Sequence, residues 1–273
     1  MARATASVKT AKLQPEGIEP YAFFAGGGVA VIDETAVIGA WNQPCEGVQF
    51  DQEVHDMFYD DYADWAHDYN DPDRKALGLG CGLAFVYLRD DGGNWVEEAV
   101  LTPNEAVAGD QFGSRTALNG DTAIVAAQGN QGDRGAAYVF VREYLPNGAA
   151  QWRQQAKLVH SYGNAGNKFA GWEALTISGD TAVVGSANEG LAHIYQRADV
   201  VWFEQATLSP IGGAAANETF GTSASIIDNV AVIGSVKELR APIPTGASVS
   251  PTSTGAACVF RRSCEVWTQV ATL

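Results

Sequence analysis

The sequence predicts an all-β protein, a β-propeller built from four-stranded antiparallel blades. A motif recurs four times in the 273 residues, and each copy begins at a phenylalanine and ends with a tryptophan followed six positions later by a leucine. The starts are Phe24, Phe112, Phe169 and Phe220, and the ends are Trp95/Leu101, Trp152/Leu158, Trp202/Leu208 and Trp267/Leu273. Each start lies eleven or twelve residues after the preceding leucine. Self-similarity with a period of about 50–60 residues indicates an array of one supersecondary unit.

Each copy contains four predicted strands. Short turns such as Asn119-Gly120 and Ser178-Gly179 join the first two, and Asn-Gly between β-rich runs is a strong hairpin signal because both residues tolerate positive φ. A third strand follows, as at 136–140, and the fourth carries the tryptophan and the leucine. One such sheet cannot bury both faces alone, so the units are expected to pack face to face as blades. A parallel αβ array is disfavoured because only one stretch has helical periodicity.

The chain is expected to be one propeller domain, or a fragment of one, over residues 1–273. The predicted blades are residues 24–101 with an insertion at 41–82, residues 112–158, residues 169–208 and residues 220–273. Residues 7–13 match a fourth strand, so one extra N-terminal strand of a preceding blade is expected. Two arrangements stay open: four blades of a larger propeller, or a self-closed ring of four.

Several short sequences carry a family resemblance. They are Phe112-Gly113, Phe220-Gly221, Val-Ile-Gly-Ala at 37–40, Val-Val-Gly-Ser at 183–186, Ala-Tyr-Val-Phe at 137–140 and the tryptophan-leucine endings. Together they resemble the FG-GAP repeats of integrin α-subunit propellers and their bacterial and algal relatives, from Ser7 to Leu273. The resemblance implies a propeller fold and a ligand-binding rim, and it says little about which ligand is bound.

The calcium loop of integrin-type repeats does not carry over. That loop reads Asp-x-Asp-x-Asp-Gly between the first and second strands, whereas this sequence has a two-residue turn there with at most one or two carboxylates (Asp121, Asp180, Asp228). Calcium takes six to eight oxygen ligands, which such a turn cannot supply. No cofactor and no metal are therefore expected.

An acidic insertion interrupts the first blade. Between Val54 and Tyr69 aromatic and aliphatic residues recur every three or four positions, while aspartates recur every four on another face, which predicts an amphipathic helix. Residues 46–80 hold ten acidic and two basic side chains. The acidic face could be solvated, bind cations or perform acid-base chemistry, and a solvated face is favoured. The aromatic face is expected to be buried against the propeller rim or a partner, with the aspartates turned outward. The predicted partner-binding residues are Asp56, Phe58, Tyr59, Asp60, Asp61, Tyr62, Asp64, Trp65 and Asp68.

Strand connectivity places this insertion on one rim of the propeller. Connections between second and third strands, and from a fourth strand to the next blade, emerge on the same rim. The insertion 41–82 and the loop 236–255, which is rich in proline, serine and threonine, both connect a second strand to a third. The glycosylation sequence Asn217-Glu218-Thr219 lies on the connection from a fourth strand to the next blade. Asn217 is therefore expected to be exposed on that rim.

The four cysteines form two local pairs. Cys45 and Cys81 bracket the insertion, and Cys258 and Cys264 flank the turn between the last two strands, so both pairs are expected to form disulfides in an oxidising compartment. Four buried thiols in a reducing cell are the alternative. Zinc is disfavoured because neither pair has a Cys-x2-Cys spacing.

Composition and motifs narrow the function classes. A formal net charge of −15 argues against nucleic acid, and no apolar run reaches the ~18–20 residues that span a bilayer. No apolar signal segment occupies the first twenty residues, which indicates a cleaved chain or a piece of a longer one. His55 and His67 lack zincin spacing, and His160 and His193 are interpreted as structural or solvated.

Two functions remain. We expect a noncatalytic extracellular, cell-surface or secretory binding and assembly module, which contacts a protein, glycan or sister subunit within a larger chain or oligomer. The alternative is an enzyme, or the accessory domain of one, with its site at the propeller axis.

Overall fold

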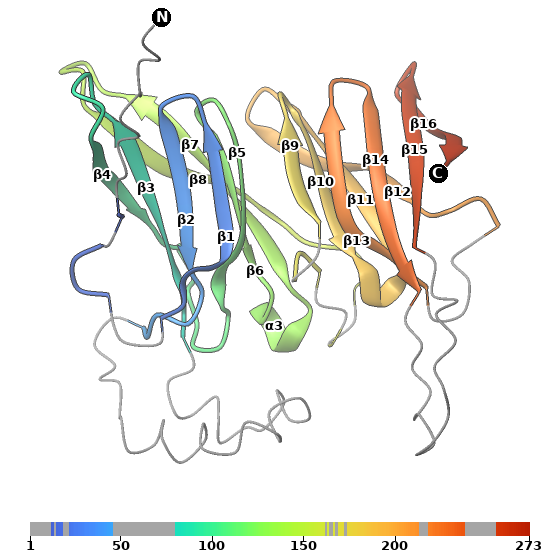
Figure 1. The fold of residues 1–273 in the computed structure, drawn as a ribbon, viewed down its shortest axis with the longest axis horizontal. Helices are drawn as coiled ribbons and strands as arrows, with labels where there is room; N and C mark the ends of the chain where they lie inside the picture. The colour runs from blue at the N-terminus through green and yellow to red at the C-terminus, as the bar shows by residue number, and fades with distance from the viewer. Residues whose placement is uncertain are drawn as a thin grey trace, which may run out of the picture.

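The computed structural model describes residues 12–13, 15–18, 22–45, 80–161, 163, 166, 169–171, 174–212, 218–237 and 255–273. These residues form four antiparallel sheets of four strands, and in every sheet the strand order follows the chain (Figure 1). The all-β, bladed fold predicted from the repeat is confirmed.

The blades are numbered in chain order. The first contains β1 (Phe24–Ile32), β2 (Thr35–Ala40), β3 (Leu83–Arg89) and β4 (Trp95–Leu101). The second contains β5 (Phe112–Asn119), β6 (Thr122–Ala127), β7 (Ala136–Tyr144) and β8 (Ala150–Leu158). The third contains β9 (Leu175–Ser178), β10 (Thr181–Ser186), β11 (Leu191–Ala198) and β12 (Val201–Leu208). The fourth contains β13 (Glu218–Ile227), β14 (Val230–Lys237), β15 (Ala256–Ser263) and β16 (Val266–Thr272). Two short helices, α3 (Asn130–Asp133) and η1 (Ala187–Glu189), lie between the second and third strands of the middle blades.

Successive sheets pack face to face, and apolar side chains fill the space between them. Separate clusters join the first blade to the second, the second to the third and the third to the fourth. The second strands β2, β6 and β10 are buried along their whole length because both of their faces are covered, by neighbouring sheets at β6 and β10 and by the second blade and the N-terminal segment at β2. This explains why their sequences are apolar without alternation, a pattern typical of strands buried on both sides.

The phenylalanine-glycine pair that opens the second and fourth repeats is an inter-blade contact. Phe112 and Phe220 are fully buried. The glycine that follows Phe112 has φ +93°, and a Cβ there would lie 2.4 Å from the Leu83 carbonyl oxygen of the preceding blade. Glycine is therefore required both by its left-handed backbone and by the close approach of a neighbouring strand.

A ladder of indole hydrogen bonds joins the outer strands. The indole nitrogens of Trp152, Trp202 and Trp267 each donate, at 2.9 Å, to a side-chain oxygen of the preceding blade. The acceptors are Glu98, Gln155 and Gln205, and each stands three residues before the closing leucine of its repeat. Each is also the extra residue of a bulge in the fourth strand, which re-aims its side chain toward the next blade.

An arginine at the end of the third strand reinforces each tryptophan. The guanidinium carbons of Arg197 and Arg262 lie 5.3 and 5.4 Å from the ring centroids of Trp202 and Trp267. Arg197 also donates to the Thr122 hydroxyl of the second blade at 3.0 Å. The guanidinium therefore stacks within its own blade and bonds the one before it.

The outward face of the fourth blade departs from this pattern. The closing leucines of the first three repeats are buried against the next sheet, whereas Leu273 is 77% exposed. In the fourth blade the bulge residue is Val270, where the first three blades have Glu98, Gln155 and Gln205. Valine cannot accept an indole hydrogen bond. Ile227, at the end of β13, is 70% exposed. Among the described strands, no comparable packing joins the fourth sheet to the first, so the sheets form an open arc and not a closed ring of four.

The predicted extra strand at residues 7–13 lies almost entirely outside the described residues. Within residues 12–18, Leu13 and Ile18 pack against the apolar cluster on the outward face of the first blade. The N-terminal segment therefore contacts the side of the first blade that faces away from the second.

Candidate functional site

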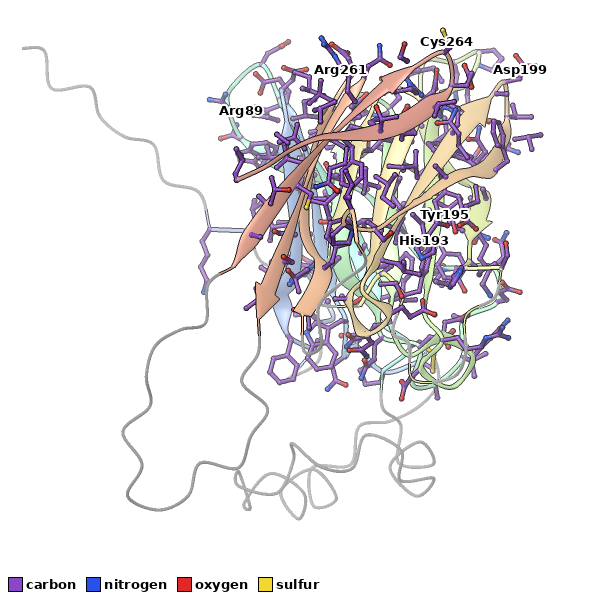
Figure 2. The ribbon with its side chains drawn as sticks, turned by 90° about the vertical axis from the view of Figure 1, so that its right-hand side faces the viewer. Arg89, His193, Tyr195, Asp199, Arg261 and Cys264 are labelled. Carbon is purple, nitrogen blue, oxygen red and sulfur yellow. A yellow bond between two sulfur atoms is a disulfide. The ribbon has the colours of Figure 1, made fainter. Side chains whose placement is uncertain are left out.

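The two rims of the arc carry different connections. The hairpin turns that contain Asp199 and Cys264 lie at one end of the molecule, where third strands turn into fourth strands (Figure 2). The helix α3 lies at the opposite end (Figure 1), and η1, the ends of β2 and β14 and the starts of β3 and β15 share that end because each belongs to a connection between a second and a third strand. We call this second end the long-connection rim, because the connections 46–79 and 238–254 begin and end there.

A disulfide closes the longest connection on that rim. Cys45 and Cys81 are bonded, with 5.0 Å between their Cα atoms and 36 residues between their positions. The bond lies just beyond the ends of β2 and β3, where the two antiparallel strands bring their side chains together. The disulfide predicted from the strand positions of these cysteines is therefore present.

The second predicted disulfide is wrong. Cys258 lies early in β15 and pairs across the sheet with Thr272, whereas Cys264 occupies the turn that follows Ser263. At about 3.3 Å per strand residue, six residues separate the two by roughly 20 Å, and a disulfide needs Cα atoms within about 7 Å. The cysteines flank the turn in sequence, but only one of them is near it. Cys258 is a buried thiol and Cys264 an exposed one.

The predicted partner-binding and glycosylation residues lie outside the described residues. They are Asp56, Phe58, Tyr59, Asp60, Asp61, Tyr62, Asp64, Trp65, Asp68 and Asn217. Their roles stay predictions. None of the helices in the described part of the chain is long and apolar enough to cross a membrane.

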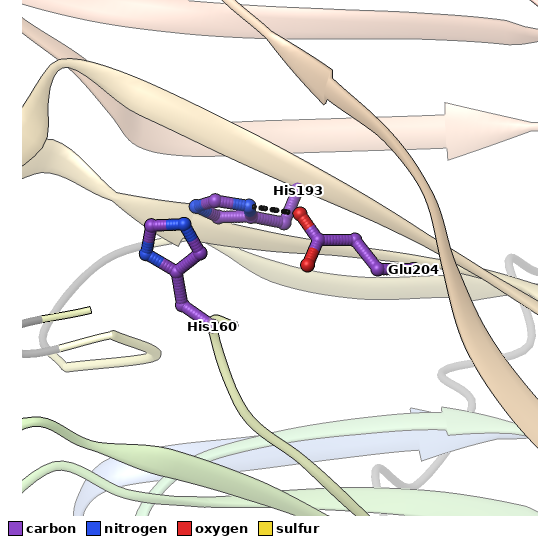
Figure 3. A group of neighbouring side chains, drawn as sticks. All are labelled: His160, His193 and Glu204. Carbon is purple, nitrogen blue, oxygen red and sulfur yellow. Dashed lines mark hydrogen bonds and ion pairs between the residues drawn. The ribbon is translucent and has the colours of Figure 1, made fainter. Parts of the chain in front are cut away.

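Two histidines and two glutamates meet between the second and third blades. His160 follows β8, Glu189 lies in η1, His193 lies in β11 and Glu204 lies in β12. The His160 and His193 rings lie 4.2 Å apart between centroids, and Figure 3 shows each ring with a nitrogen turned toward the other. The cluster thus joins the connection that leaves the second blade to the sheet of the third.

Each histidine is oriented by a carboxylate. The Nδ1 atom of His193 lies 2.9 Å from Glu204 Oε1, and the Nδ1 atom of His160 lies 3.1 Å from Glu189 Oε2. The carboxylates are themselves held in place, because Thr207 Oγ1 donates to Glu204 at 2.9 Å and Ser186 Oγ donates to Glu189 at 2.6 Å. A built hydrogen-bond network fixes both rings.

Burial sets the charge state of this network. His193 is completely buried, and burial lowers its pKa more than the hydrogen bond with Glu204 raises it. Burial alone would raise the pKa of Glu204, but hydrogen bonds with His193 and Thr207 outweigh it and lower the pKa. The stable combination is a neutral imidazole that donates through Nδ1 to an ionised carboxylate.

One nitrogen atom of the network has its hydrogen-bonding capacity unused among the described residues. The Nε2 atom of His193 is buried, and among the described residues it has no hydrogen-bond partner. With Nδ1 protonated, Nε2 carries a lone pair, and it lies in the region that the His160 ring faces. One ligand atom each from His160, His193 and Glu204 lies within 4.8 Å of the other two.

The sequence interpretation of His160 and His193 missed this cluster, although a signal was present. In the third strands of the other blades the position of His193 is occupied by Phe85, Tyr138 and Cys258. A titratable ring at a position that is otherwise aromatic or apolar indicates a special environment. In the preceding interface the same pocket holds Tyr138, whose ring lies 5.3 Å from the Lys157 ammonium.

Comparison with known proteins supports the fold. The FG-GAP repeat family matches residues 95–140, which run from β4 through β7. A crystal structure of a protein from Lactobacillus plantarum aligns with 15% identity and a TM-score of 0.44, covering 70% of this chain and 51% of that protein. This chain therefore spans about half the length of that protein. No curated protein is similar enough to count as a match.

Proposed function

We propose that this β-propeller chain, which carries an FG-GAP repeat, is a noncatalytic binding and assembly module. It contacts a protein, a glycan or a sister subunit through the long-connection rim, in an extracellular, cell-surface or secretory setting. The single observation that carries the proposal is the Cys45–Cys81 disulfide at the base of residues 46–79.

The disulfide supports both the rim and the setting. Closing a loop of 36 residues stabilises a fold by roughly 4 kcal/mol in the chain-entropy model. Such a bond persists in oxidising compartments and is rare in the cytosol. A covalent closure keeps a long acidic connection anchored at two adjacent strand ends, which suits a segment that must present side chains to a partner.

The outward face of the fourth blade supports assembly. It carries Ile227, Val266, Val270 and Leu273, all more than half exposed. Several exposed aliphatic side chains on one face of a sheet often mark a contact surface. A further sheet, supplied by another subunit, is the partner whose shape fits this face.

An enzyme with a site at the axis is the alternative. The innermost strands β1, β5, β9 and β13 follow one another around the arc. In the described residues, the histidine and carboxylate cluster draws on β11 and β12, the outer strands of the third blade, and not on these innermost strands. The placement favours the binding module over axial catalysis.

Replacement of one connection tests the proposal. Residues 46–79 are replaced by a short Gly/Ser linker that leaves Cys45 and Cys81 in place, and the variant is compared with the intact chain on arrays of glycans and extracellular proteins. We expect the variant to lose a partner that the intact chain binds. Binding of that partner by the intact chain should weaken as the salt concentration increases.

The control replaces a turn on the opposite rim, residues 145–149, by Asn-Gly. This change should leave binding unaltered. Equal binding by the 46–79 replacement and the intact chain, or loss only in the opposite-rim control, would contradict the rim assignment.

A further inference from the structure

We propose that His160 and His193 bind a divalent transition metal ion, of which Zn²⁺ is the best chemical fit, with Glu204 as the carboxylate that orients the His193 ring. The site lies between the second and third blades, and an ion there ties the connection after β8 to the sheet of the third blade. This inference is independent of the binding role proposed for the rim.

The orphaned Nε2 of His193 is the main argument. A buried polar atom without a partner costs free energy, and native structures seldom leave one unexplained. Because Nδ1 donates to Glu204, the group presented by Nε2 is a lone pair, which requires a donor or a cation. In metal sites a ligating histidine generally donates its other nitrogen to a carboxylate, which is the arrangement of His193 and Glu204.

His160 repeats the arrangement from the opposite side. Its Nδ1 atom contacts Glu189, and a nitrogen of its ring is turned toward His193 (Figure 3). A cation between the two facing nitrogens satisfies the buried Nε2 atom of His193. The ionised Glu204 carboxylate beside His193 also favours a divalent cation in this partly buried space.

The donor set indicates the class of metal. Imidazole nitrogens suit zinc and its first-row neighbours, whereas calcium and magnesium prefer oxygen ligands. Zinc lies about 2.0–2.2 Å from such ligands, so two ligands of one ion stand at most roughly 4 Å apart. The His160 and His193 ring centroids lie 4.2 Å apart, so a small rotation of the His160 side chain sets the two facing nitrogens within that separation.

The test uses the full chain after removal of metal by a chelator. Native mass spectrometry and calorimetry with ZnCl₂, in 0.15 M salt with excess Mg²⁺, should show one zinc ion per chain and a higher melting temperature. Co²⁺ in place of Zn²⁺ should give the visible absorption of a site that contains nitrogen ligands.

Variants locate the site. His160→Asn and His193→Gln should each weaken zinc binding by roughly 100-fold or more, and Glu189→Gln should weaken it by about 10–100-fold through His160. The matched control is His55→Asn/His67→Asn, which removes the other two histidines of the chain and should bind zinc like the wild type. Near-UV circular dichroism of the least buried variant, His160→Asn, checks that the fold persists.

Three results would overturn the proposal. They are the absence of zinc uptake by the wild type at micromolar concentration, retention of binding by a folded His160→Asn variant, and loss of binding in the His55→Asn/His67→Asn control.

Discussion

At the scale of single residues, the fold rests on a small set of positions that recur once per blade. The bulge residue of the fourth strand accepts a hydrogen bond from the next tryptophan, and the arginine beside that tryptophan reaches back to the preceding sheet. Such contacts are directional, so they fix how each blade is rotated on its neighbour, a property that apolar packing alone leaves loose.

The Trp202–Gln155 bond should be measurable as a coupling energy. Trp202→Phe and Gln155→Leu each remove one partner and should lower the free energy of unfolding by about 1–2 kcal/mol. The double variant should cost less than the sum, with a coupling of roughly 1 kcal/mol in urea denaturation. Strict additivity would show that the indole bond contributes nothing to stability.

Asp110 should make stability depend on pH. The residue is almost fully buried, and burial raises its pKa more than the contacts with Asn130 and Val107 lower it. A carboxyl whose folded-state pKa exceeds its unfolded value contributes most stability below the unfolded pKa and loses it as pH rises through the folded pKa. Asp110→Asn lacks this titration, so its stability relative to the wild type should increase from pH 4 to pH 7.

The measurement is urea denaturation of both proteins across that pH range. The difference between their two free energies of unfolding removes the contribution of groups that titrate identically in both proteins. Parallel stability curves would show that Asp110 ionises as easily in the folded protein as in the unfolded one.

At the scale of elements, glycines at the start of third strands allow adjacent blades to approach. Gly135 has φ +81°, and a Cβ there would lie 2.0 Å from the Phe169 carbonyl oxygen. Gly148 has a nearly identical φ of +83° in a turn with nothing within 4 Å of an added Cβ. The pair therefore separates backbone strain from the steric clash.

We expect Gly148→Ala to cost about 1 kcal/mol and Gly135→Ala roughly 3 kcal/mol or more, by thermal or urea unfolding. The additional cost of Gly135→Ala over Gly148→Ala reports how closely the second and third blades pack at this point. Equal costs would mean that the strand after Gly135 can move away from Phe169 freely.

Much of each element could be predicted from sequence, because the repeat fixes strand order and the alternation of faces. The Cys45–Cys81 disulfide followed from strand positions alone. The Cys258–Cys264 pair failed because closeness in sequence was taken for closeness across a hairpin, whereas the register aligns Cys258 with Thr272. The cluster around His193 was missed because His160, Glu189 and Glu204 come from three separate elements, which only the packing of one blade on another brings together.

At the scale of the whole molecule, four blades follow one another in an open arc. One interface is used three times, and the fourth blade presents the corresponding face with aliphatic side chains where the others have polar acceptors. The long-connection rim carries the disulfide, and the opposite rim carries the tight hairpin turns (Figures 1 and 2). Binding through one rim and assembly through the fourth blade are therefore compatible.

Differential labelling of the four cysteines tests the central claim, which is that the blades pack through one repeated interface and that a disulfide closes the long connection of the first. The native protein is alkylated without reductant, unfolded, alkylated with a second reagent and mapped by peptide mass spectrometry. We predict that Cys264 is labelled rapidly, that Cys258, buried between the third and fourth blades, is labelled only after unfolding, and that Cys45 and Cys81 are recovered as one linked peptide. A Cys258–Cys264 bond, free thiols at Cys45 and Cys81, or rapid labelling of Cys258 in the native protein would contradict the account.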